Sequence, residues 1–312
     1  MYIINPDPYS LPTYRIGPFR TMDLALNHYL PNDDRIDTYL AERFSDRFFS
    51  YTYNGREAIH LALRHYDLER KDVVTILTTS GNLYISSCVT NEIEKFCKWS
   101  REILPETKVI LINHEFGYPY TKLYEIKGLG LPIIEDCAGS FFSEDIYHSI
   151  GRTGDFVIYS FPKMFPIQVG GMIISRVNSI ICQSSVLNAE MQHYIKNVLS
   201  ENIQYKEKII SKRIANYTGL RERFGSLGLH ERFELHDGIV PGVFMFRTDN
   251  HTFDLLELKK HFWAHGIHSS VFYGEKAFFI PVHQALQESD LDYFYEVMKA
   301  FIQSQKYEVC KY

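Results

Sequence analysis

Two charged residues that follow apolar runs are the first candidates for chemistry in this chain. The segment IIEDCAGSFF (133–142) is a buried-strand pattern that ends in Asp136, and DFVIYSFPKMFPIQVGGMII (155–174) is an apolar strand that runs into Lys163. In an open α/β fold both positions lie at one edge of the sheet, where active sites are built. A lysine with an aspartate nearby is the minimal apparatus for Schiff-base chemistry on a pyridine cofactor. The pair therefore predicts a cofactor site at this edge.

The surroundings of Lys163 fit this chemistry. A lysine amine must be partly neutral to form such a bond, and an apolar setting favours the neutral form. The flanking residues SFPKMFPI are apolar. The alternative is a surface lysine whose stem lies along the end of a strand.

Apolar runs alternate with helical patterns through the first two thirds of the chain. Strands are expected at 73–80, 108–116, 131–138, 156–162 and 170–176, and helices at 21–30, 35–48, 56–66, 83–103 and 121–130. Continuous Val/Ile runs separated by helices are typical of a parallel sheet that is covered on both faces. The fold class is therefore α/β.

The last third of the chain predicts a smaller unit. We expect a long connecting helix over 178–223, strands at 242–249 and 277–283, a helix at 253–266, and a closing helix that begins after Ser289 as its N-cap. The predicted division is an N-terminal arm (1–35), a large α/β domain (36–200), and a connecting helix with a small α+β domain (201–312).

Composition excludes several classes of protein. The chain has 312 residues, of which 45% are hydrophobic and 23% are charged, and its net charge of −5 gives no polybasic surface for nucleic acid. Its five cysteines include no CxxC pair, which argues against a disulfide framework and a structural zinc site. The histidines are scattered, so no metal site is expected. No signal peptide is visible and the apolar runs are too short for a membrane, so we expect a cytoplasmic protein.

The order of several motifs resembles the DegT-like branch of the vitamin-B6-dependent nucleotide-sugar aminotransferases. The motifs are NGREAIHLAL (54–63), KVILINHEFGYPYTKLYEIKGLGLPIIEDCAGSF (108–141), GDFVIYSFPKMFPIQVGGMII (154–174) and FFIPVHQALQESDLDYFYEVMKAFI (278–302). The resemblance covers most of the chain and implies the aspartate-aminotransferase fold, called fold type I. It also implies pyridoxal 5'-phosphate as the cofactor.

The resemblance gives three residues a role at the pyridine ring. Lys163 would hold the cofactor aldehyde and then carry the α-proton, and Gly170-Gly171 stand behind it as in the family. Asp136 would pair with the ring nitrogen, because a carboxylate there keeps the ring protonated and electron-withdrawing; the alternative is an acid that caps the next turn. Tyr84 matches a ring that stacks on the pyridine, although a tyrosine at a strand end is more often packing.

Three further residues are candidates for binding the phosphate. A helix that starts near Gly55 presents free N–H groups and the positive end of its dipole to an anion. Arg56 could add a guanidinium contact, or it could be an exposed first-turn arginine. By resemblance, Ser160 matches a phosphate-contacting serine at the strand end.

The chain departs from the family pattern in four places. Gly139 stands where the family has Gln or His, and Arg56 where it has a small hydroxyl residue. Two residues are missing between Ser160-Phe161 and Lys163, and the segment ahead of AFFIPVH lacks a long sugar-facing loop.

The resemblance implies an aminotransferase that acts on a nucleotide-linked keto-sugar, with glutamate as the expected amino donor. It implies a homodimer and a product for polysaccharide or glycoconjugate biosynthesis. Two alternatives stay open: a non-catalytic relative that binds or assembles, and a pyridoxal-phosphate-dependent sugar dehydratase, in which histidine can replace the lysine. A Rossmann-type enzyme ranks behind, since no GxGxxG turn follows the first strand.

Overall fold

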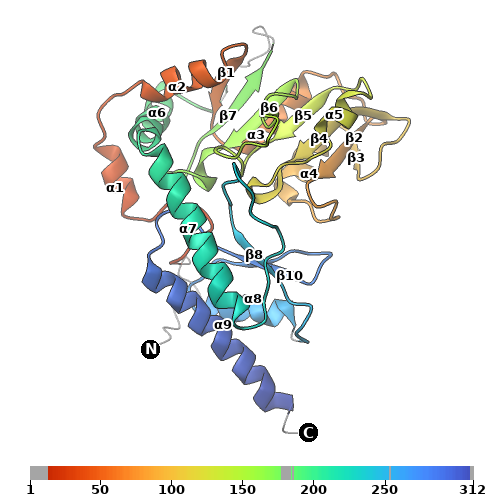
Figure 1. Ribbon diagram of the computed structural model, residues 1–312. Helices are drawn as coiled ribbons and strands as arrows, with labels where there is room; N and C mark the ends of the chain where they lie inside the picture. Colours follow the sequence, from red (N-terminus) through yellow and green to blue (C-terminus); the bar gives the residue numbers. More distant parts are fainter. Residues whose placement is uncertain (1–12, 177–183, 185, 253, 310–312) are drawn as a thin grey trace.

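The computed structural model describes residues 13–176, 184, 186–252 and 254–309. Within them a seven-stranded sheet has the strand order β1-β7-β6-β5-β4-β2-β3, and a smaller sheet has the order β8-β10-β9 (Figure 1). The large sheet comprises β1 (Phe48–Thr52), β2 (Val73–Thr78), β3 (Lys98–Ser100), β4 (Thr107–Asn113), β5 (Ile133–Asp136), β6 (Phe156–Ser160) and β7 (Gly171–Ser175). The small sheet comprises β8 (Phe244–Arg247), β9 (Ser270–Val271) and β10 (Ala277–Ile280).

The large sheet is parallel through its centre. Strands β3, β2, β4, β5 and β6 pair in parallel, whereas β7 is antiparallel to both β6 and β1. The small sheet is antiparallel. The predicted α/β class, with a mostly parallel sheet and a smaller C-terminal α+β part, is confirmed.

Helices cover both faces of the large sheet, as continuous apolar strands require. Helices α3 (Gly55–Arg64) and α4 (Ser87–Ile93) pack on one face, in a cluster that includes Val74, Leu111 and Ile158. On the other face, α2 (Arg35–Arg43) and α6 (Ala189–Ile203) pack over Val157 and Ile174. Helix α5 (Leu123–Lys127) packs against Ile110 and Ile112.

The C-terminal part is tied to the large sheet by a long helix. Helix α7 (Lys206–Gly225) runs from the large sheet down to α9 (Glu288–Val309), against which it packs, and α8 (Leu255–Ala264) contacts α9 beside the small sheet (Figure 1). The N-terminal segment carries α1 (Asp23–His28). In this structure none of the described helices is long and apolar enough to cross a membrane.

Several predicted elements differ from the structure. The segment predicted as one connecting helix contains two, because the chain turns at Gln204 and Tyr205 between α6 and α7; residues 178–183 and 185 lie outside the described part. The closing helix begins at Glu288, so Ser289 is not its N-cap: the amide of Leu291 already donates to the carbonyl of Gln287. The predicted helix at 83–103 gives way to the short strand β3, which pairs with the start of β2. The domain boundaries stay a prediction.

Candidate functional site

The carboxyl ends of the central strands meet at one edge of the large sheet. The register pairs Thr78 with Asn113, and Asn113 with Asp136. Strand β6 runs parallel to β5, so it ends at Ser160 on the same edge, and there it pairs with Gly171 at the start of β7. The expectation that Asp136 and the segment leading to Lys163 share an edge therefore agrees with the strand register.

Helix α3 begins at this edge, in close contact with β6 and β7. A Cβ added at Gly55 would lie 3.2 Å from Cβ of Ser160, and one added at Gly171 would lie 2.6 Å from the carbonyl carbon of Asn54. The amide of Gly170 donates to the carbonyl of Tyr53, and the φ of +106° at Gly170 favours glycine. The glycines thus allow the helix end and two strands to meet. Gly55 and Ser160, predicted as phosphate contacts, lie side by side.

The first turn of α3 keeps two amides available. Asn54 is the N-cap, and its Oδ1 accepts the amide of Glu57 at 3.0 Å. The Glu57 carboxylate turns back to accept the amide of Tyr53 at 2.6 Å. In the described part of the chain no acceptor takes the amides of Gly55 and Arg56, whose helix positions leave them without intrahelical partners. The Arg56 side chain is exposed. This end of the helix can bind an anion.

Asp136 is buried at the end of β5, with a hydrogen-bond donor on each oxygen. Asn113 Nδ2 donates to Oδ2 at 2.7 Å, and the amide of Ala138 donates to Oδ1 at 3.0 Å. A carboxylate has about four lone-pair positions, so the oriented group can accept a further donor. Sequence reasoning did not single out Asn113, although a polar residue at the end of the apolar run KVILIN was a usable signal.

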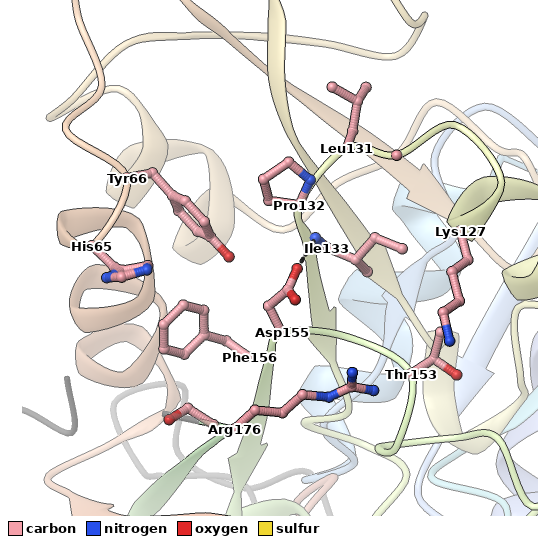
Figure 2. A pocket seen from close by; sticks show the side chains of 12 residues that line it. His65, Tyr66, Lys127, Leu131, Pro132, Ile133, Thr153, Asp155, Phe156 and Arg176 are labelled. Atoms are coloured by element: carbon pink, nitrogen blue, oxygen red, sulfur yellow. Dashed lines mark hydrogen bonds between the residues drawn. The ribbon is translucent and has the colours of Figure 1, made fainter. Parts of the chain in front are cut away.

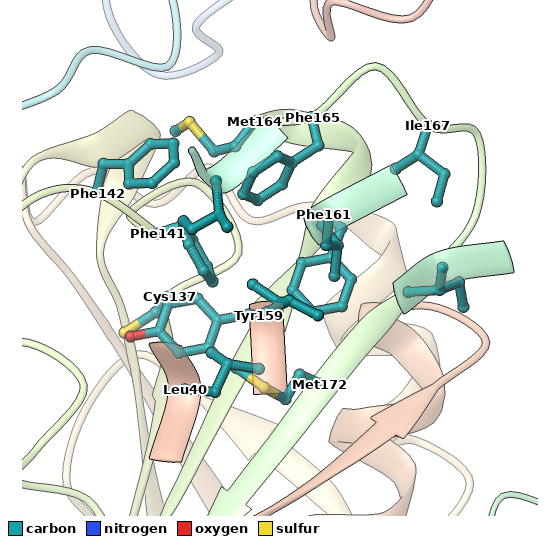
Figure 3. Packing of buried hydrophobic residues seen from close by; sticks show 14 of the residues in the cluster. Leu40, Cys137, Phe141, Phe142, Tyr159, Phe161, Met164, Phe165, Ile167 and Met172 are labelled. Atoms are coloured by element: carbon teal, nitrogen blue, oxygen red, sulfur yellow. The ribbon is translucent and has the colours of Figure 1, made fainter. Parts of the chain in front are cut away.

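Lys163 is exposed, so the apolar setting predicted for its side chain is not observed; residues on both sides of it in the turn are buried instead. It ends a short 3-10 segment, Phe161–Lys163, directly after β6. Around it, Phe161, Met164, Phe165 and Ile167 insert into the core cluster between the sheet and the helices α2 and α6 (Figure 3). The loop, two residues shorter than the family pattern, is therefore anchored on both sides of the lysine, which alone among these residues faces outward.

Tyr84 lies in a different environment from the other candidates. It is half-buried, and its ring contacts Phe272 and Tyr273 near the small sheet, with centroids 5.9 and 5.7 Å away. Burial raises the pKa of its hydroxyl. These contacts join the large sheet to the small one. The structure brings Tyr84 into no described contact with Asp136 or Lys163.

Position 139 faces the backbone of the turn at Phe116 and Gly117. A Cβ added at Gly139 would lie 3.4 Å from the amide nitrogen of Gly117 and 3.5 Å from Cα of Phe116. The segment just before β8 holds that turn, since the amide of Gly242 donates to the carbonyl of Phe116 at 2.6 Å. At these separations a Cβ is in ordinary van der Waals contact, so the packing does not require glycine at position 139.

Behind Asp136 lies a buried group of His114, Glu135 and Cys137, whose potential ligand atoms lie within 4.8 Å of one another. Tyr120 donates its amide to Nδ1 of His114, so Nε2 carries the proton and donates to Glu135 at 3.0 Å. Burial would raise the pKa of Glu135, but His114 and the amides of Gly154 and Gly151 hold it below its usual range. Burial also raises the pKa of the Cys137 thiol.

This buried group has the hydrogen bonds of a structural support. Three amides of the 151–154 loop donate to the carboxylate of Glu135. Because the imidazole and the carboxylate already have partners, and the thiol is held protonated, the three residues connect the ends of β4 and β5 to the loop before β6. They offer few free lone pairs to a cation.

A cavity of about 440 Å³ lies at the opposite edge of the sheet (Figure 2). Its lining includes Ile133 and Phe156, the first residues of β5 and β6, together with Lys127, Asp155 and Arg176. None of the predicted site residues lines it, so it is separate from the edge that carries Asp136 and Ser160.

Comparison with known proteins shows which family a part of this chain is similar to. A model of the DegT/DnrJ/EryC1/StrS aminotransferase family matches residues 97–193, which include Asp136, Ser160 and Lys163. The resemblance predicted from the sequence is confirmed. No protein of curated function matches the sequence.

Solved structures share the fold over nearly the whole chain at low identity. The aminotransferase TlmJ from Streptoalloteichus hindustanus is 15% identical, with a TM-score of 0.72 over 91% of this chain and 95% of its own. An aminotransferase from Psychrobacter cryohalolentis is 15% identical, with a TM-score of 0.69 over 93% and 99%. The E. coli GDP-4-keto-6-deoxy-D-mannose-3-dehydratase is 13% identical, with a TM-score of 0.68 over 92% and 100%. The predicted fold type I architecture is confirmed.

Proposed function

We propose, starting from the relationship to the DegT/DnrJ/EryC1/StrS aminotransferases, that this protein is a pyridoxal-phosphate-dependent aminotransferase of a nucleotide-linked keto-sugar. The observation that carries the proposal is the turn of Lys163. One exposed lysine follows β6 among buried neighbours, at the sheet edge where β5 ends in a carboxylate and α3 begins. We further propose glutamate as the amino donor and a homodimer as the working unit.

The residues at this edge fit a phosphorylated pyridine. The amides of Gly55 and Arg56, the dipole of α3 and the Ser160 hydroxyl suit a phosphate group. The Glu57 carboxylate does not oppose an anion directly, because hydrogen bonds from the Tyr53 amide and the Ser184 hydroxyl hold it back from the helix end. Asp136 offers a buried, oriented carboxylate to a ring nitrogen.

The bound cofactor would supply an electron sink and carry the amino group from donor to acceptor. The protein's own groups would do the rest. Asp136 would hold a proton on the ring nitrogen, with its carboxylate oriented by Asn113. The α3 amides and Ser160 would fix the phosphate and so the ring position. Lys163 Nζ would link to the cofactor and move the proton to and from the reacting carbon of each substrate.

Fold likeness alone does not separate transamination from dehydration, since structures of both kinds match this chain. The residue that ends the short turn after β6 favours transamination. Sugar dehydratases of this family can carry histidine at that position, and here it is Lys163. The roles of Tyr84 as a stacking ring and Arg56 as a phosphate ligand belong to this proposal as well.

An absorbance titration tests the proposal. Purified protein incubated with pyridoxal phosphate is expected to give an absorbance band near the visible edge, which borohydride removes. The reduced cofactor should then be found on the peptide that contains Lys163. Lys163→Ala should lose the band. Lys208→Ala, at an exposed residue of α7, is the control and should keep it. A wild-type protein without the band would support the non-catalytic relative instead.

A further inference from the structure

The backbone of the Lys163 turn is held by side chains from three distant parts of the chain. Arg213 Nη2 of α7 donates to the carbonyl of Lys163 at 2.9 Å. Gln284 Nε2, which follows β10, donates to the carbonyl of Met164 at 2.8 Å. Asn27 Nδ2 of α1 donates to the carbonyl of Pro166 at 2.8 Å. Each of these three backbone carbonyls therefore accepts a hydrogen bond from a different side chain.

Arg213 is the centre of this arrangement. Its side chain is fully buried, and its other donors reach Oε1 of Gln284 at 2.8 Å and the carbonyl of Pro241 at 3.1 Å. Among the residues described, it forms no ion pair with a carboxylate, and burial lowers the pKa of its guanidinium to about 9. Burying a cation without a counter-charge is unfavourable, and an apolar side chain of similar size would avoid that cost. What arginine adds is a rigid planar fork that reaches several carbonyls at fixed angles.

The remaining sides of the turn are also restrained. Phe161, Met164 and Phe165 are buried in the core cluster. On the side of the N-terminal arm, a Cβ added at Gly17 would collide with the carbonyl oxygen of Pro162. The freedom left in this segment is therefore mainly that of the Lys163 side chain.

We propose that Arg213 and Gln284 form a positioning pair, which sets the direction of the Lys163 side chain by holding the carbonyls of Lys163 and Met164. The pair touches no reacting atom; it acts through the turn. Reactivity at a lysine depends on its direction, since a displacement of about 1 Å at a reacting group costs about 100-fold in rate. This inference rests on the proposed function for its consequence, but the restraint itself can be measured without the cofactor.

The first measurement uses the cofactor-free protein. A lysine-specific endoprotease cleaves after an exposed lysine only where the backbone can open locally. Arg213→Lys keeps the charge but loses the fork, and Gln284→Ala loses both contacts of the glutamine. Each is expected to raise cleavage between Lys163 and Met164 by about tenfold relative to cleavage after Lys71, because one or two hydrogen bonds are lost. The extent of cleavage after Lys163 and after Lys71 is measured from the intact masses of the fragments.

The second measurement separates positioning from binding. Both variants should form the borohydride-trapped adduct at Lys163 about 100-fold more slowly than wild type. Their affinity for pyridoxine 5'-phosphate, which has the phosphate and ring but no aldehyde, should stay within about twofold, because the pair does not contact that ligand. Arg223→Lys is the matched control: Arg223 also lies on α7, but it bonds Asp292 and Glu288, and its change should leave both readouts as in wild type.

The outcomes decide between the two proposals. A wild-type protein that takes no pyridoxal phosphate at Lys163 would overturn the proposed function, while the protease readout would still test the restraint. Wild-type cleavage and adduct rates in both variants would overturn the positioning pair. Equal increases in cleavage at Lys163 and Lys71 would overturn it too, since they would report general unfolding. If Arg213→Lys does not fold, Gln284→Ala, at a half-buried residue, decides the question.

Discussion

Asp136 is oriented by neutral donors. Asn113 and the amide of Ala138 each occupy one carboxylate oxygen, and among the described residues no lysine or arginine forms an ion pair with it. Neutral hydrogen bonds fix the direction of a carboxylate without cancelling its charge. The carboxylate can therefore pair with a cationic ring nitrogen, as the proposed function requires.

Replacing Asn113 tests this role at the residue scale. Asn113→Ala should weaken binding of pyridoxal phosphate by about tenfold, because a hydrogen bond to a charged group is lost. The dissociation constant is measured by absorbance titration, with thermal unfolding as the check on folding. Asn202→Ala removes an amide that only bonds within its own helix, and should leave the constant unchanged. An unchanged constant for Asn113→Ala would remove Asn113 from the site.

At the scale of elements, the site depends on how closely α3 approaches β7. The backbone of Asn54 and Gly55 lies where a Cβ at Gly171 would be, with nearest distances of 2.6 to 2.8 Å. These neighbours are backbone atoms, so they cannot turn aside as a side chain can. The meeting of helix and strand is what brings the amides of Gly55 and Arg56 to the edge that carries Asp136.

Gly171→Ala should therefore lower the free energy of unfolding by about 3 kcal/mol, the upper range for inserting an atom into a packed interior. Gly225→Ala is the matched control, since a Cβ there meets nothing within 4 Å. It should change the free energy by less than about 1 kcal/mol, through helix propensity. Urea unfolding measures both. Equal small effects in the two variants would contradict the close approach.

At the scale of the whole molecule, His283 joins parts that are far apart in the sequence. Its ring bonds the backbone of Arg15 in the N-terminal arm, and its carbonyl accepts from Asn216 of α7 at 2.9 Å. Burial, together with the nearby charge of Arg213, lowers the pKa of His283 to about 3. The imidazole is therefore neutral in the folded protein at any pH near neutrality.

This gives a dependence of stability on pH. An unfolded histidine has a pKa of about 6.5, so between pH 6.5 and 3 the unfolded state binds a proton that the folded state does not. The stabilisation is complete above pH 6.5 and decreases as the pH falls, by about 1.4 kcal/mol at pH 5.5. Urea unfolding at pH 7.5 and 5.5 should show this decrease in wild type, and a decrease smaller by that amount in His283→Gln. The same decrease in both proteins would show that His283 is not buried as a neutral group.

Much of the fold could be predicted from local patterns. The apolar runs at 73–80, 108–116 and 156–162 predict β2, β4 and β6 because continuous Val/Ile sequence is typical of doubly covered strands. The short strands β3 and β9 were missed, since two or three residues carry no period. Ser289 fits the N-cap pattern, because it is a hydroxyl residue before an acidic and apolar run, but the chain is already helical at Glu288.

The sequence by itself determined that an acid and a lysine follow neighbouring strands, and so which sheet edge to consider. Polar residues that end apolar runs are a local signal, and parallel strands bring such ends together. Only the tertiary structure decided what holds them. Arg213 lies 50 residues from Lys163, and Gln284 lies 120 residues from Met164. The Arg213 and Gln284 side chains both donate to backbone carbonyls, which every residue has. No side-chain pattern in the sequence could therefore predict these contacts.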